Sequence, residues 1–319
     1  MQRLWFALCL LALTHAGWAQ VVSNPPFGSA ISHARTLEAG ALAGDVPHHI
    51  HYDLKLYNHK GKLTTGTWDI WRDPLHFTRT DIVAGDFHYT HIEDLVHTIQ
   101  WRHFNTVMPL KVYDLRQNYR EPAFAVSYFS MPSGSNTVHF EQVEGLPFDC
   151  TNLRFQMQVC FDPLVHVLAF ARVFNQTMTW EDWQPIGMHT IPRRFRIYDA
   201  GRVMVEATGT AEAVKSFPAG LFTIPPNEPD MGEPEDNGAT PHKVLASKPV
   251  PLDLLYGNLL VKVAVNAGGD VHKVDLIDAD DDDLIKPAVE FTKHLTFAPQ
   301  SAPFEQYIYV KYNVGVQEQ

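Results

Sequence analysis

Alternating polar and apolar residues dominate the chain before residue 224 and predict β-strands. The clearest case is 49–56, which leads into a turn at Asn58–Gly61. When polar and apolar residues alternate with a period of two residues, one face of the strand points toward the core and the other points toward solvent. We therefore expect an antiparallel meander. Further strands are expected at 63–71, 153–161, 165–174, 193–198 and 202–207, with a tight turn at 199–201.

Two segments between these strands have helical rather than alternating spacing. In 92–105 and 110–119, apolar residues recur at intervals that could form one helical face, including Leu95 and Ile99. Such spacing is typical of amphipathic helices. We expect a helix in each segment.

The pattern after residue 252 predicts a smaller unit. Asp280–Asp283 precede its apolar helix, at the end where negative charge favours the helix dipole. The expected order is strand, strand, helix, strand. These elements are 259–265, a turn at 268–270, 271–277, a helix at 284–295, and 307–314.

A linker separates the two patterns. Residues 225–251 are rich in Pro, Gly and acidic side chains and have no apolar periodicity. This composition is typical of linkers. We therefore expect one domain at 20–224 and another at 252–319.

The first nineteen residues have the pattern of a signal peptide. Arg3 precedes the apolar run 4–13, and Gly17-Trp18-Ala19 places small residues before an expected cleavage at Gln20. The alternative is an uncleaved membrane anchor, but a span requires about twenty apolar residues. We expect a periplasmic or secreted protein whose mature chain has no transmembrane span.

The net charge and the cysteine content limit which classes of partner the protein can bind and which chemistry its cysteines can carry out. The chain has a formal net charge of -11 and no cluster of basic residues, which disfavours nucleic acids as partners. Once Cys9 leaves with the signal peptide, Cys150 and Cys160 remain, and an oxidising compartment favours a disulfide between them. Two buried thiols are the alternative. A catalytic thiol is less favoured, because no activating base is evident nearby.

The first domain resembles the LolA/LolB-like half-barrel family. The resemblance covers about 37–225 and rests on the Gly-Lys-x-x-x-Gly-x-Trp-x-Ile-Trp motif at 61–71, Cys160–Asp162 and the Gly-x-x-x-Ile-Pro-Arg-Arg motif at 187–194. It implies an incomplete antiparallel barrel over helices, with an apolar cavity for acyl chains. The alternative is a fully packed interior.

The second domain resembles the TonB C-terminal domain over about 249–316. The matching positions are Gly257, the turn at 269–271, the helix from Leu284, and Phe297-x-Pro299. The resemblance implies contact with envelope proteins. The last strand could add a partner strand at its edge, with Tyr307, Tyr309 and Lys311 on one face.

Together these patterns predict an α+β protein. Its N-terminal part would be an antiparallel β half-barrel with helices packed inside. Its C-terminal part would be a small β-β-α-β domain of the TonB type.

Candidate catalytic and metal-binding residues are sparse. His48, His49 and His51 could meet His88 or His91, but no carboxylate or cysteine completes a ligand spacing. The Asp278–Asp283 run lacks the glycine and glutamate of a calcium loop. No nucleophile, phosphate-loop or dinucleotide motif occurs. We expect no metal, no cofactor and no enzymatic activity.

Two functional hypotheses remain. The leading one is an envelope protein that binds a lipid or another apolar molecule in its first domain and contacts envelope proteins through its second. The alternative is a structural interaction module without a ligand cavity. A third and weaker hypothesis is a hydrolase with a site at Trp180–Trp183, where aromatic and acidic groups could face a sugar.

Overall fold

The structure is a computed structural model, and the predicted signal peptide and most of the predicted linker lie outside the residues that it describes. These residues are 46–73, 77–94, 98–102, 107–118, 139–143, 146–153, 157–164, 167–173, 176–187, 189–223, 244–246 and 257–312.

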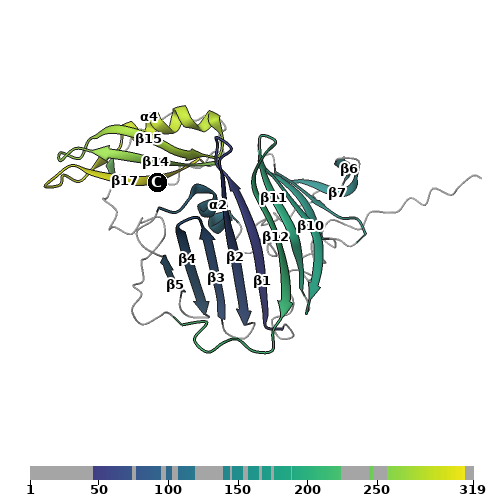
Figure 1. The fold of residues 1–319 in the computed structure, drawn as a ribbon. Helices are drawn as coiled ribbons and strands as arrows, with labels where there is room; N and C mark the ends of the chain where they lie inside the picture. Colours follow the sequence, from purple (N-terminus) through teal and green to yellow (C-terminus); the bar gives the residue numbers. More distant parts are fainter. Residues whose placement is uncertain are drawn as a thin grey trace, which may run out of the picture.

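One antiparallel sheet of twelve strands forms most of the described chain (Figure 1). Its order is β5-β4-β3-β2-β1-β12-β11-β10-β9-β8-β7-β6, so two runs of sequential neighbours meet where β1 pairs with β12. The strands are β1 His48–Tyr57, β2 Leu63–Asp73, β3 Phe77–Ala84, β4 Phe87–Asp94, β5 Thr98–Arg102, β6 His139–Val143, β7 Leu146–Leu153, β8 Met157–Phe161, β9 Leu168–Val173, β10 Gln176–Ile186, β11 His189–Asp199 and β12 Arg202–Ala213.

Two of the turns follow directly from their residues. In the β1–β2 turn the Asn58 side-chain oxygen accepts hydrogen bonds from the backbone N–H groups of Lys60 and Lys62, and Gly61 has a φ of 74°. In the β11–β12 turn, Ala200 and Gly201 have φ values of 45° and 80°. Positive φ at both central positions is the geometry that matches the twist of a hairpin.

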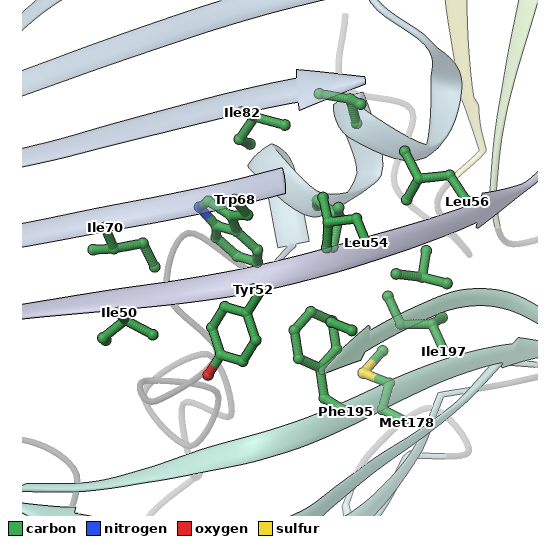
Figure 2. Close-up of a cluster of buried hydrophobic side chains, with 14 of the residues drawn as sticks. Ile50, Tyr52, Leu54, Leu56, Trp68, Ile70, Ile82, Met178, Phe195 and Ile197 are labelled. Atoms are coloured by element: carbon green, nitrogen blue, oxygen red, sulfur yellow. The ribbon is translucent and has the colours of Figure 1, made fainter. Parts of the chain in front are cut away.

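The main core lies on one face of the large sheet, which we call the inner face. Its apolar residues come from both halves of the sheet and point toward one another (Figure 2). The Phe195 ring lies edge-on to Tyr52 at 5.4 Å and to Trp68 at 6.1 Å. The Tyr52 hydroxyl donates a 2.6 Å hydrogen bond to the Pro192 carbonyl oxygen, so this buried polar group is satisfied.

The predicted α+β class is wrong. Strands dominate the described residues, which contain two α-helices of nine residues each. The first, α2 (Leu110–Asn118), covers part of the inner face with Leu110, Val112 and Leu115. The helix predicted at 92–105 is also wrong, because its described parts belong to β4 and β5.

A second, three-stranded sheet contains the C-terminal elements. Its order is β15-β14-β17, and a separate two-stranded ladder pairs β13 with β16. The helix α4 packs on the three-stranded sheet, with Ala288 and Phe291 in the same apolar cluster as Ile308 and Val310. The elements are β13 Val244–Ala246, β14 Gly257–Val265, β15 Val271–Ala279, the 3-10 helix η3 Asp282–Leu284, α4 Ile285–Lys293, β16 Thr296–Phe297 and β17 Phe304–Tyr312.

The C-terminal sheet packs against α2 and the end of the large sheet (Figure 1). Lys111 of α2 is buried and forms an ion pair with Asp280, and its ammonium lies 3.6 Å from Asp114. The Asn258 amide donates a 2.8 Å hydrogen bond to Asp114, and the Asn258 N–H donates one of 2.7 Å to Asp280. These four buried residues form a polar junction between α2 and the C-terminal sheet.

The polar junction changes the protonation of its groups. Burial opposes the charged form of Lys111, but the charges of Asp280 and Asp114 raise its pKa above the ordinary value. Burial and the charge of Asp280 raise the pKa of Asp114 well above that of an ordinary aspartate. Asp199 lies at the end of β11, near Asp280 of the junction and the adjacent Asp281. Its burial, together with the negative charges of Asp281 and Asp280, raises the pKa of Asp199 to about 7.

Candidate functional site

A groove of about 1100 Å³ lies on the outer face of the large sheet, opposite the main core, over β9, β10 and β11. Pockets that hold small molecules commonly have volumes of roughly 300–1,000 Å³. This groove is large enough for one such molecule. It is lined by Leu146, Phe148, Asp162, Leu164, Val167, Ala169, Phe170, Arg172, Thr177, Thr179, Trp180, Glu181, Asp182, Trp183, Pro185, Thr190, Arg196, Tyr198 and Gly201.

The register of the strands explains why these side chains meet. Thr179 of β10 lies opposite Phe170 on one side and Arg196 on the other, so the three form a row across the sheet. Successive side chains on a strand point to opposite faces. The residues next to them, such as Met178 and Ile197, therefore enter the main core.

One wall of the groove is apolar, and two of its residues are strongly exposed. Leu146 and Leu164 are 61% and 88% exposed, whereas Phe148 is half-buried and Phe170 is 4% exposed in the same lining. Contiguous exposed apolar surface is uncommon on folded proteins and marks sites that contact a ligand or partner. This wall is the part of the groove best suited to an apolar ligand.

The predicted Cys150–Cys160 disulfide is present and supports this wall. It joins directly opposed residues of β7 and β8, with a Cα–Cα distance of 4.0 Å. Both sulfur-bearing residues are fully buried in a small cluster with Phe148 and Phe170. The disulfide therefore joins β7, which carries Phe148, to β8, whose Cys160 lies directly opposite Phe170 of β9.

The floor of the groove carries a row of ion pairs. Arg196 forms an ion pair with Glu181 at 2.8 Å and a second one with Glu206 at 3.5 Å. Glu206 also forms an ion pair with Lys55 at 3.2 Å. Burial lowers the pKa of Arg196, but Glu181, Tyr198 and Glu206 together outweigh this effect and raise it. The hydrogen bond from Lys55 lowers the pKa of Glu206. These groups are thus charged and mutually compensated.

The Trp180–Trp183 segment does lie at the groove. Asp182 has a φ of 57° and interrupts the regular pairing of β10 with β11, and it pairs with Arg193 at 3.5 Å. Trp180 belongs to the main core, while Trp183 is half-buried and packs against it. The two tryptophans therefore pack in the protein interior more than they present flat faces to a sugar.

The candidate histidines of β1 do not meet those of β4. His49 and His51 are on β1, whereas His88 and His91 are on β4, three strand spacings or roughly 14 Å away. His49 and His51 both bond one oxygen of Asp69, at 2.8 and 2.7 Å. Over the described ranges, no group of three or more His, Cys, Asp or Glu side chains could hold a metal ion.

The candidate edge residues are divided between two environments. Tyr307 and Tyr309 pack against the main core of the large sheet, while Lys311 is exposed. The alternation expected for this strand is correct over 307–311, because Ile308 and Val310 lie on the opposite face against α4. Partner binding at the β17 edge stays a prediction.

The acidic run at 278–283 has a structural role that the sequence did not indicate in full. The Asp281 side chain accepts a hydrogen bond from the Asp283 N–H and caps η3, as expected for a helix start. Asp280, however, binds the buried Lys111, and Asp278 binds His59 at 2.8 Å. The run therefore connects the C-terminal sheet to the rest of the chain.

The comparisons with known proteins give distant structural neighbours. No protein-family model matches the chain, and no curated protein matches it. Among solved structures, a DUF1329 family protein from Desulfovibrio piger has a TM-score of 0.41 and 9% identity, covering 62% of this chain and 97% of its own. A candidate outer membrane lipoprotein-sorting protein domain from Vibrio parahaemolyticus has a TM-score of 0.39 and 8% identity, with coverages of 61% and 97%.

A LolA superfamily protein from Nitrosomonas europaea is similar at a TM-score of 0.34 and 10% identity, covering 61% of this chain and 97% of its own. These neighbours do not support the TonB resemblance of the C-terminal domain. Across the described ranges, no helix combines the length and apolar character needed to cross a membrane.

Proposed function

We propose that this chain is an exported, non-enzymatic protein that binds one molecule with a long apolar chain in the outer-face groove. The observation that carries the proposal is the apolar wall at Leu146, Phe148, Leu164 and Phe170, two of whose members are mostly exposed. Covering such surface with a ligand removes apolar area from water, which is favourable by about 25 cal/mol per Å².

The dimensions of the groove favour an acyl chain as the occupant. Its lining follows β10 from Thr177 to Pro185, which is eight residue steps or roughly 26 Å. An acyl chain within one leaflet of a bilayer spans about 15 Å, half of the hydrocarbon core. The groove therefore accommodates an extended acyl chain together with a polar head group.

The proposal moves the binding site away from the position that the half-barrel resemblance implied. On the inner face, Tyr52, Leu54 and Trp68 are 0–1% exposed and pack against the opposite half of the sheet. The groove instead uses the other face of β9, β10 and β11. Its charged residues form ion pairs with one another, which supports binding rather than catalysis.

The test is a titration of the full mature chain with a fluorescent palmitate analogue. Thr179→Trp adds a large side chain at the floor of the groove, and we expect it to weaken binding at least tenfold. Thr208→Trp makes the same change at an exposed position of β12 outside the groove lining, and it should leave the affinity unchanged.

Three results would overturn the proposal. Absence of saturable binding by the wild-type chain would favour the alternative of a structural interaction module. Equal affinities of the wild type and Thr179→Trp would show that the chain binds somewhere other than the groove. Cleavage of a glycoside by the purified chain would instead favour the hydrolase hypothesis.

A further inference from the structure

The lining of the groove is asymmetric in charge along β10. At the Thr177 end it carries Arg172, which lies directly opposite Thr177, and Tyr198 on the next strand. Toward the other end it carries Glu181 and Asp182, whose charges are paired with arginines, followed by Trp183 and Pro185. A ligand with one polar end would therefore find different surroundings in its two possible orientations.

Arg172 differs from the other arginines near the groove. Arg193, Arg194 and Arg196 each have a carboxylate within 3.5 Å. Arg172 is exposed, its guanidinium lies 5.3 Å from the centre of the Phe170 ring, and in the described part of the chain no carboxylate forms an ion pair with it. Its charge is thus available at the edge of the apolar wall.

The acidic residues of the groove are already engaged elsewhere. Glu181 pairs with Arg194 and Arg196, and Asp182 pairs with Arg193. The Asp162 carboxylate accepts a 2.8 Å hydrogen bond from the Leu164 N–H, in the turn between β8 and β9. None of these acids is paired with Arg172.

Hydroxyl groups accompany the arginine. Thr177 and Tyr198 are half-buried and follow Arg172 in a row across β9, β10 and β11. The Tyr198 phenol also lies beside Arg196, whose pKa it helps to raise. An arginine flanked by hydroxyl donors is a suitable environment for an anionic oxygen group, because hydrogen bonds between charged partners are the strong ones.

We propose that the ligand is an acidic amphiphile whose anionic head group binds Arg172, with its apolar chain running along β10 past Phe170 toward Leu164 and Trp183. This inference rests on the proposed function and adds the charge and the orientation of the ligand. Phe170 contributes to both parts, because its ring packs under the guanidinium and also belongs to the apolar wall.

The experiment compares two ligands of equal chain length that differ in charge. A neutral fluorescent probe bound to the full mature chain is displaced with palmitate or with hexadecanol. We expect palmitate to bind about tenfold more tightly than hexadecanol, because its carboxylate forms a charge-assisted hydrogen bond with Arg172 that the neutral hydroxyl cannot match.

Variants of Arg172 test whether this residue causes the preference of the groove for an anionic ligand. Arg172→Gln should weaken palmitate about tenfold and leave hexadecanol unchanged, while Arg172→Lys should retain most of the preference. Lys215→Gln removes an exposed cation outside the groove lining and should change neither affinity.

The possible failures are distinguishable. If neither ligand displaces the probe and the probe itself does not bind, the proposed function is wrong. If both ligands bind with equal affinity, or if Arg172→Gln retains the preference for palmitate, the groove binds apolar chains but Arg172 does not select an anionic head group.

Discussion

The hydroxyl group of Tyr309 donates a 2.7 Å hydrogen bond to the carbonyl oxygen of Met108, 201 residues earlier in the chain. The Tyr309 ring also stacks on Tyr113 of α2, with ring centres 4.4 Å apart. The face of β17 that carries Tyr307 and Tyr309 is therefore an internal contact surface. It holds the C-terminal sheet against α2 and the residues that precede this helix.

Replacing Lys111 by Met should lower the free energy of unfolding by about 3 kcal/mol or more. The substitution leaves Asp280 without its buried cation, and removing one partner of a buried ion pair typically costs 3–5 kcal/mol. Denaturant unfolding measures the change. The control is Lys293→Met, which removes an exposed lysine paired with Glu290 and should cost less than 1 kcal/mol. Equal effects of the two substitutions would contradict the role assigned to the polar junction.

Replacing Asp199 by Asn should stabilise the chain at pH 8 but change its stability little at pH 4. Burial and the charges of Asp281 and Asp280 raise the pKa of Asp199 from 3.8 to about 7. The folded state therefore holds this proton more tightly, and the associated stability is present below pH 3.8 and lost as the pH rises through about 7. Denaturant unfolding at both pH values measures the difference. A larger gain at pH 4 than at pH 8 would refute this assignment.

Replacing Cys150 and Cys160 together by Ala should lower the free energy of unfolding by roughly 2–4 kcal/mol, the usual contribution of a disulfide. It should also weaken ligand binding, because the two residues pack with Phe148 and Phe170 of the groove wall. Thermal unfolding and the palmitate titration measure the two effects. The control is wild-type protein treated with a reductant, which should lose stability in the same direction. An unchanged affinity for palmitate in the double variant would show that the disulfide does not support the ligand-binding wall of the groove.

Replacing Gly209 by Ala should destabilise the large sheet where β1 meets β12. A Cβ atom at this position would lie 2.1 Å from the His51 carbonyl oxygen, and backbone at that distance must move. Overpacking of this kind typically costs 1–3 kcal/mol. Thr210→Ala, at the exposed neighbouring position, serves as the control in the same thermal unfolding measurement. The steric argument fails if Gly209→Ala is as stable as the wild type.

The strands and turns were the most predictable part of the fold. The pattern of 49–56 and the turn at Asn58–Gly61 indicated β1 and its hairpin, because local residues determine both. The helix expected at 92–105 was wrong for a tertiary reason. Residues 98–102 pair with β4 in the large sheet, and this pairing overrides the helical spacing of Leu95 and Ile99.

The groove could not be located from the sequence. Phe170, Thr179 and Arg196 lie far apart in the chain and meet because of the register of three strands. A detectable signal was that β9 and β10 carry large or functional side chains at both even and odd positions, so neither face is purely solvent-exposed. The polar junction could not be predicted from the sequence either, because no local pattern connects Lys111 with Asp280.

Photocrosslinking of a diazirine-bearing palmitate to the full mature chain tests the location of the binding site most directly. After irradiation and digestion, mass spectrometry identifies the labelled peptides. The groove predicts labels on residues 146–198, centred on Phe148, Leu164 and Phe170, and their loss when unlabelled palmitate competes. Competable labels on inner-face residues such as Tyr52 and Trp68, or on the C-terminal sheet at 257–312, would contradict the account.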